Sequence, residues 1–257
     1  MTDEVREFYK KLASNYHFIF ADWRKSVLVQ SEVLDRLLKG YLHGERPTVL
    51  DCACGIGTQA IGLAVRGYIV HGTDLSTEAV ERAQQEALTF QVDVTFGVAD
   101  FRHLEDTVPG QFDAVIAFDN AIAHLPTSDD LELALHSMAA RVAPGGVLAI
   151  SLRDYDRTAQ ERPHSTLPVV KDDSEGRSIV FQVWDWNAAG TAYRTSFFTL
   201  RQHGDEWETL CATSDMRAWQ RADVTASLAK TGLTNLIWYM PEDSGYYQPI
   251  VAARKPA

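Results

Sequence analysis

The densest group of residues able to bind a ligand lies at 49–58, which reads VLDCACGIGT. A short apolar segment ends at Asp51, and Gly55 and Gly57 follow it closely. Glycines let the backbone turn tightly and approach a ligand, because no Cβ stands in the way. A pyrophosphate needs uncompensated amides at a helix N-terminus. The neighbouring acid therefore favours a ligand that carries an ammonium or sulfonium group.

Two further acids follow the next apolar segments. Asp74 lies 17 residues beyond Gly57, a spacing that suits a carboxylate binding two neighbouring ribose hydroxyls. Asp100 comes in the same register after the following segment. Ala53 stands where a dinucleotide fingerprint has its first glycine, and no third glycine follows at the required place. A nucleoside cofactor explains this set better than a plain turn capped by Thr58.

Alternating strands and helices must position these residues. Apolar segments separated by amphipathic ones indicate a parallel sheet covered on both faces. Right-handed crossovers then give a doubly wound α/β fold. We expect strands at 48–52, 68–73, 92–97, 114–118 and 147–152, and helices at 58–66, 77–89 and 131–142.

After residue 152 this alternation stops. Consecutive strands are expected at 178–186, 193–201 and 207–214, then a helix at 223–231 and strands at 235–240 and 247–254. This predicts an antiparallel insertion near the carboxyl edge of the sheet, on the substrate side, where ligands of open α/β sheets bind. We interpret 1–257 as one domain, with an N-terminal helical lid (1–45), a core (48–152), an antiparallel excursion (155–220) and a closing helix and strands (221–257).

The composition excludes several classes of protein. The 257 residues are 46% hydrophobic and carry a net charge of −11, so an ordinary globular fold is expected and nucleic acid is disfavoured as a partner. We find no apolar run long enough to cross a membrane, and the polar first residues do not resemble a signal peptide. Three cysteines, two of them at 52 and 54, argue for a reducing compartment and suit no zinc site. We therefore expect a cytoplasmic protein without a metal.

Residues 48–152 as a whole resemble the class I S-adenosylmethionine (SAM) dependent methyltransferases. The segments that carry the resemblance are VLDCACGIG, HGTDLS, GVADF, FDAVIAFDNAIAHLP and VAPGGVLAISLRDYD. The resemblance implies a Rossmann-like sheet with SAM as the cofactor. It also implies a set of cofactor contacts: Asp51, Ala53, Gly55 and Gly57 in the loop, Asp74 and Leu75 after the second strand, Asp100 and Phe101 at the adenine, Phe118 and His124, and Tyr16 in the N-terminal segment that closes over SAM.

The segment FDNAIAHLP and the following RDY are similar to the glycine and sarcosine N-methyltransferases. That resemblance implies that Asn120 and Arg153 hold the carboxylate of a small amino acid, with Tyr247 in the same pocket and His124 near the SAM sulfonium or carboxylate. An arginine binds a carboxylate through a two-pronged fork, and tyrosine stabilises an alkylammonium. The expected partner is therefore a small amine carboxylate, and a homo-oligomer is possible.

Several alternatives stay open. Arg153 can instead pair with Asp154 or Asp156 at the end of its strand, and Asn120 and His124 can simply cap a loop. The chain can also be an O- or S-methyltransferase of another small metabolite, or a SAM-binding protein without catalysis. A dinucleotide oxidoreductase is disfavoured by the missing third glycine.

Overall fold

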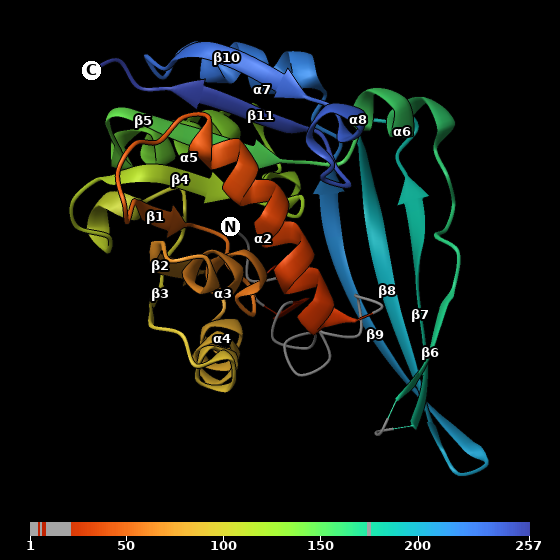
Figure 1. Ribbon diagram of the computed structural model, residues 1–257. Coiled ribbons are helices and arrows are strands. Elements are labelled where there is room, and N and C mark those ends of the chain that lie inside the picture. The colour runs from red at the N-terminus through yellow and green to blue at the C-terminus, as the bar shows by residue number, and fades with distance from the viewer. Residues whose placement is uncertain (1–4, 6, 9–21, 174–175) are drawn as a thin grey trace.

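The computed structural model describes residues 5, 7–8, 22–173 and 176–257 (Figure 1). Its centre is a seven-stranded sheet in the order β10-β11-β5-β4-β1-β2-β3. Five strands run parallel, and β10 and β11 join antiparallel at one edge. The strands are β1 (Thr48–Asp51), β2 (Ile69–Asp74), β3 (Val94–Val98), β4 (Phe112–Ala117), β5 (Val142–Ser151), β10 (Thr234–Tyr239) and β11 (Ile250–Arg254).

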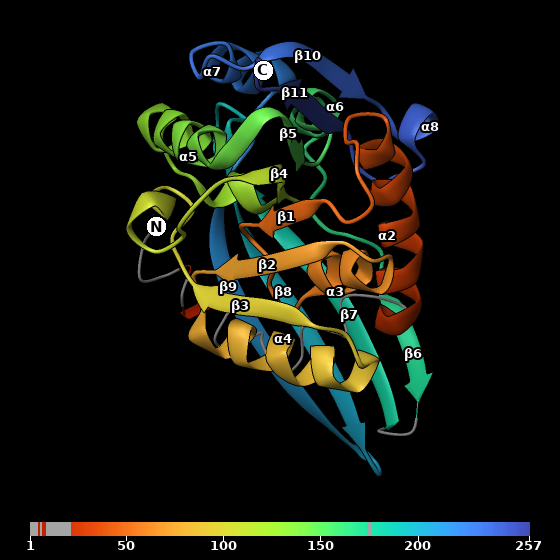
Figure 2. The same ribbon diagram turned by 60° about the vertical axis from the view of Figure 1, so that its left-hand side comes forward.

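Helices cover both faces of this sheet. On one face α2 (Trp23–Lys39), α3 (Thr58–Val65) and α4 (Thr77–Phe90) pack against it, and on the other face lie α5 (Ser128–Arg141) and α7 (Arg221–Leu228). Figure 2 shows α3 and α4 beside the parallel strands, with α5 on the opposite side. The expected doubly wound fold is confirmed.

The helices α4 and α5 each begin after a residue whose side chain caps the first turn. The side chain of Ser76 accepts a hydrogen bond from the backbone N–H of Ala79 at the start of α4, and Thr127 accepts one from Asp130 at the start of α5. Such caps satisfy amides that the first helical turn leaves without a partner. The helix α4 therefore starts directly after Asp74, which ends β2.

The expected antiparallel insertion is present as a second sheet in the order β6-β7-β8-β9. It consists of β6 (Val169–Asp173), β7 (Gly176–Trp186), β8 (Ala192–His203) and β9 (Glu206–Arg217), and α6 (Tyr155–Glu161) precedes it. The strand β6 and the helix α6 were not predicted. Figure 1 shows β7, β8 and β9 as long strands that extend beyond the central sheet.

Three short elements complete the fold: η2 (Leu104–Asp106), η3 (Ala121–His124) and α8 (Pro241–Ser244). The last strand, expected at 247–254, begins only at Ile250, because residues 245–249 form a loop beside the cleft described below. Among the described residues, no helix is long and apolar enough to cross a membrane.

Candidate active site

A cleft opens at the carboxyl ends of β1, β2 and β4. This is the edge at which open α/β sheets bind their ligands. Its walls come from four segments of the central sheet region and from the N-terminal Val5. The lining residues are Val5, Cys52, Ala53, Cys54, Gly55, Thr58, Gln59, Asp74, Leu75, Phe101, Phe118, Asp119, Ala121 and His124.

The loop after β1 forms one wall through its two glycines. Gly55 has a φ of +52°, and a Cβ built on it meets no atom within 4 Å, so its backbone faces open space. Gly57 has a φ of +94°, and a Cβ there would lie 2.8 Å from Cδ1 of Ile61. Gly55 thus lets a ligand approach the backbone, whereas Gly57 lets α3 pack closely.

Asp74 fixes this loop to the end of β2. Its Oδ2 accepts a hydrogen bond from the N–H of Gly55 at 2.9 Å, and its Oδ1 accepts one from the N–H of Ser76 at 2.9 Å. Burial raises the pKa of the Asp74 carboxyl. Asp74 also lines the cleft, so it can meet a ligand hydroxyl from the position expected of it.

Asp51 is completely buried at the end of β1. Its Oδ1 accepts a long hydrogen bond of 3.4 Å from Ala53, and its Oδ2 has no hydrogen-bond partner among the described residues. Burial, with added repulsion from Asp74 and Asp119, raises its pKa to about 8. A cationic ligand in the neighbouring cleft would stabilise the charged form of this acid. The buried carboxyl groups of Asp51 and Asp74 therefore fit a cofactor that carries an ammonium and a sulfonium group.

The loop after β4 places a second acid at the cleft. Asp119 and Asn120 both have positive φ angles, of 56° and 71°, which is a strained backbone for two consecutive residues with side chains. The Asp119 carboxylate accepts hydrogen bonds from Gln59 Nε2 at 2.9 Å, from the Tyr247 hydroxyl at 2.6 Å and from the Tyr246 hydroxyl. This acid is held in place by three donors.

The side chain of Asn120 links the end of β5 to two tyrosines through hydrogen bonds. Its Oδ1 accepts a hydrogen bond from the backbone N–H of Arg153 at 3.0 Å, and its Nδ2 donates to the Tyr155 hydroxyl at 2.9 Å. The hydroxyls of Tyr155 and Tyr193 lie 3.0 Å apart. Asn120 is thus engaged within the protein and positions Arg153 and Tyr155.

The guanidinium of Arg153 lies against the inner side of the antiparallel sheet. Its Nη1 donates to the Tyr193 hydroxyl at 3.0 Å, and its Cζ lies 4.2 Å from the centre of the Trp184 ring. Within the described part of the chain Arg153 pairs with neither Asp154 nor Asp156. Asp156 pairs with Arg221 instead, at 2.5 Å. The structure gives the Arg153 guanidinium no carboxylate partner among the described residues.

His124 lines the cleft at the end of η3. Its Nδ1 lies 3.1 Å from the hydroxyl of Ser214 on β9, and its ring lies 5.9 Å from that of Phe8. Burial lowers the pKa of His124 to about 4, so the imidazole is neutral near pH 7. The residue connects the cleft to the antiparallel sheet.

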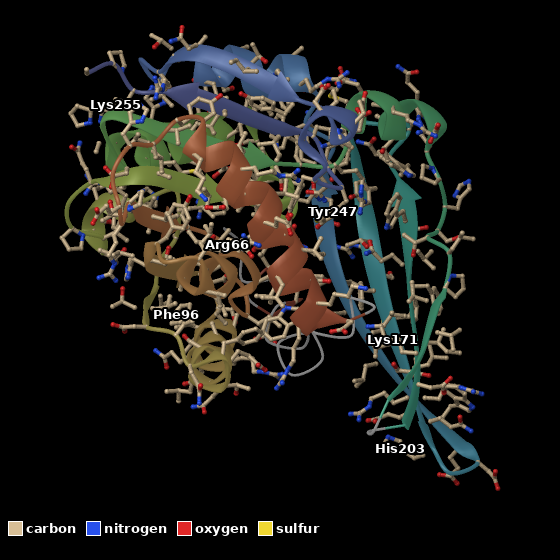
Figure 3. All side chains as sticks on the ribbon, in the orientation of Figure 1. Arg66, Phe96, Lys171, His203, Tyr247 and Lys255 are labelled. Carbon is tan, nitrogen blue, oxygen red and sulfur yellow. The ribbon has the colours of Figure 1, made fainter. Side chains whose placement is uncertain are left out.

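The other expected residues divide into four groups. Those in the cleft wall are Ala53, Leu75, Phe101 and Phe118. Asp100 does not line the cleft, since Arg102 binds its carboxylate at 2.8 Å and also pairs with Asp130 at 2.6 Å. Tyr247, labelled in Figure 3, is 58% exposed and reaches the cleft through its bond to Asp119. Tyr16 falls outside the described residues.

Several residues of the site were missed in the sequence. Asp119 lies inside the segment FDNAIAHLP, and Gln59 directly follows the segment 49–58, so their positions gave a local signal. Tyr155 is part of the RDY segment that carries the resemblance, but no role was predicted for it, and neither Trp184 nor Tyr193 was predicted to contact Arg153. Their contacts with Arg153 depend on how the insertion folds back over the site, and only the structure reveals that.

Known proteins resemble this chain in sequence and in fold. A family model described as "Methyltransferase domain" matches residues 49–146. The glycine/sarcosine N-methyltransferase of Parasynechococcus marenigrum is 35% identical over 136 residues, which are 53% of this chain and 47% of that protein. Residues 49–146 therefore form a methyltransferase domain of the SAM-dependent type.

Two further comparisons describe how wide this family is. The ubiquinone biosynthesis O-methyltransferase of Alkalilimnicola ehrlichii is 37% identical to this methyltransferase over 195 residues, covering 76% of this chain and 66% of that protein. The SAM-bound structure of CalS10, an amino pentose methyltransferase of Micromonospora echinaspora, superposes with a TM-score of 0.72 at 17% identity and covers 90% of this chain and 92% of that one. At that identity the likeness concerns the fold.

The extent of these matches limits what they say about the substrate. The alignment spans about half the length of the glycine/sarcosine relative and about half of this chain. The relatives include N- and O-methyltransferases, so they do not select a methyl acceptor for this chain.

Proposed function

We propose that this methyltransferase transfers the methyl group of SAM to the amine of a small amino acid such as glycine or sarcosine. The observation that carries the proposal is the Arg153 guanidinium, which contacts Tyr193 and Trp184 and has no carboxylate partner among the described residues. A guanidinium in that state favours an anionic ligand and binds a carboxylate through two parallel hydrogen bonds.

The cofactor side of the proposal rests on the loop after β1. Asp74 would hold the ribose hydroxyls, the open backbone at Gly55 would lie against the methionine part, and Asp51 would offset the positive charge. When bound, SAM supplies an electrophilic methyl group on a positively charged sulfur. Leu75, Phe101 and Phe118 give this cleft apolar walls that exclude water from the reacting groups.

The acceptor side of the proposal rests on Arg153 and its neighbours. Arg153 would bind the substrate carboxylate, while Asn120 and the Tyr155–Tyr193 pair keep it oriented. Holding two reacting groups in line is the main contribution that this chemistry needs from a protein, since no covalent intermediate with the enzyme is required.

The need to remove a proton from the amine limits the roles that Tyr193 and His124 can take. The nucleophile is the neutral amine, so its ammonium form must first lose a proton. Burial raises the pKa of Tyr193 well above its usual value, so this phenol keeps its proton and serves as a hydrogen-bonding group. The neutral imidazole of His124 lines the cleft and can accept a hydrogen bond from the amine.

The test is product analysis by mass spectrometry. The purified protein is incubated with SAM and, separately, with glycine, sarcosine, dimethylglycine, other amino acids, amines, amino sugars and phenols. Methylated glycine or sarcosine, with an equal amount of S-adenosylhomocysteine, would support the proposal. Cofactor binding with no methylated amino acid would refute the acceptor and leave the family assignment intact.

A second candidate is O-methylation of a small metabolite. It is favoured by the O-methyltransferase of Alkalilimnicola ehrlichii, whose alignment covers a larger share of this chain than that of the glycine/sarcosine enzyme. The same panel separates the two, because a phenolic product without a methylated amine would select this candidate.

A further inference from the structure

The carboxylate of Asp119 lies in the wall of the cleft, where only neutral groups bond to it. Its donors are the amide of Gln59 and the hydroxyls of Tyr246 and Tyr247. Burial, with repulsion from Asp119, raises the pKa of the Tyr246 hydroxyl well above its usual value, so this phenol keeps the proton that it donates. Among the described residues, no lysine, arginine or histidine forms an ion pair with Asp119. A positively charged ligand group nearby would therefore stabilise this carboxylate.

One hydrogen-bonding position on the Asp119 carboxylate is available to a ligand. A carboxylate offers about four such positions, two on each oxygen. Oδ1 accepts from both tyrosines, whereas Oδ2 accepts only from Gln59 Nε2, at 2.9 Å, within the part of the chain that the structure describes. Gln59 lines the cleft and the two tyrosines do not, so Oδ2 is the oxygen on the cleft side. A ligand in the cleft can therefore reach the second position on Oδ2.

The main chain fixes Asp119 to the same strand end as Arg153. The N–H of Asp119 donates to the hydroxyl of Ser151, the last residue of β5, at 2.8 Å. The next residue, Asn120, accepts a hydrogen bond from the N–H of Arg153 at 3.0 Å. One end of β5 thus anchors an anionic and a cationic side chain, which match the amino and carboxylate groups of an amino acid. Groups held in place in this way can stabilise a developing charge without having to reorganise.

We propose that Asp119 binds the amino group of the methyl acceptor and stabilises the positive charge that develops on its nitrogen during transfer. The inference rests on the proposed function and adds a group that selects an amine as the acceptor. One N–H of the neutral amine would donate to Oδ2 of Asp119. His124 lines the same cleft and can accept from the second N–H of a primary amine. The nitrogen lone pair is then left to face the methyl group.

The movement of charge during the reaction gives Asp119 its effect on rate. The amine nitrogen donates its lone pair to the methyl carbon, the bond between that carbon and sulfur breaks, and the electron pair of that bond stays on sulfur. Positive charge therefore moves from sulfur to nitrogen, and the product ammonium later loses its proton to solvent. A carboxylate beside the nitrogen interacts more strongly with the transition state than with the neutral amine, so it raises kcat.

The same carboxylate acts against acceptors of the other candidate class. A phenol attacks as its anion, and the negative charge of Asp119 would repel that anion and raise its pKa. Asp119 is therefore expected to favour N-methylation over O-methylation.

The experiment compares two substitutions at this position. Asp119→Asn removes the charge with little change of shape. Asp119→Gly removes the whole side chain at a φ of 56°, a conformation that glycine adopts readily, so this variant is expected to fold. In both variants the kcat for glycine should fall about 10- to 100-fold, the loss expected for one hydrogen bond to a charged group. The KM for glycine should change by a smaller factor, and the Kd for SAM, measured by calorimetry, should change little.

The matched control is Asp93→Asn. Asp93 is an exposed acid between α4 and β3, away from the cleft, so the loss of its charge should leave kcat unchanged. An unchanged kcat in either folded Asp119 variant, with glycine still methylated, would overturn the role of Asp119 and leave the proposed function intact. Methylation of a different amine, lost in both variants, would refute the amino acid as acceptor and support the role of Asp119. A wild type that methylates only phenols, or variants whose affinity for SAM falls as much as their rate, would overturn the inference.

Discussion

Replacing Arg153 with alanine tests the acceptor site most directly. The substitution removes the only group proposed to bind the substrate carboxylate. A hydrogen bond to a charged group contributes about 1.5–3 kcal/mol, and about 1.4 kcal/mol corresponds to a tenfold change in affinity. We therefore expect the KM for the amino acid to rise about 10- to 100-fold. The Kd for SAM should change little, because the cofactor contacts lie in the loop after β1.

The same substitution also has a structural cost that must be separated from binding. Arg153 loses its contact with the Trp184 ring and its hydrogen bond to Tyr193. An interaction of each kind contributes about 1 kcal/mol, so a modest fall in Tm is expected. Tyr193→Phe keeps the aromatic ring and removes only the hydroxyl. It should raise the KM by a smaller factor than Arg153→Ala.

The assay is initial-rate kinetics at saturating SAM, with SAM binding measured by calorimetry. Arg157→Ala is the matched control. Arg157 lies four residues after Arg153, in α6, where its exposed side chain pairs with Glu161. It should leave KM and kcat unchanged. An unchanged KM in Arg153→Ala, or a loss of SAM affinity as large as the loss of amino-acid affinity, would refute the role given to Arg153.

Further predictions concern the cofactor loop and pH. The pKa of buried Asp51 is raised to about 8, so the folded state without ligand holds a proton that the unfolded chain has lost. The stability of the folded protein should therefore fall as the pH rises from about 4 to about 8. In Asp51→Asn that fall should be reduced in thermal unfolding curves, and SAM should bind more weakly by calorimetry. His124, with its pKa lowered to about 4, acts in the opposite direction: stability should rise between about pH 4 and pH 6.5, and His124→Gln should flatten that part of the curve. Gly57→Ala combines a φ of +94° with a Cβ 2.8 Å from Ile61, so urea unfolding should show a loss of more than about 1 kcal/mol. Gly55→Ala meets no neighbouring atom and should affect SAM affinity more than stability; the reverse ranking of the two variants would contradict the roles assigned to these glycines.

The cofactor half of the site was predictable because it is local in sequence. The loop from Asp51 to Gly57 connects one strand to the next helix, and Asp74 ends the adjacent strand. Parallel neighbours bring their carboxyl ends to the same edge, so residue spacing alone places these groups together. Asp100 shows the limit of this argument, since its ion pair with Arg102 depends on a side chain two residues away.

The acceptor half was less predictable because its contacts are long-range. Trp184 and Tyr193 reach Arg153 only through the pairing of β7 with β8, which brings residues of the insertion back to the end of β5. Tyr247 was expected in the pocket, whereas the buried member of the pair is Tyr246. Adjacent residues in a loop point in different directions, and the sequence contains no signal that chooses between them.

The two halves of the site also stand on separate parts of the chain. The cofactor loop belongs to the central sheet, whereas Trp184, Tyr193 and Ser214 reach the site from the antiparallel insertion. Mutations in the insertion can therefore reshape the proposed acceptor pocket without disturbing the loop after β1. A protein built in this way can exchange one methyl acceptor for another by gradual change in three strands. Libraries confined to the inner positions of β7, β8 and β9 offer the shortest route to new acceptors for laboratory evolution.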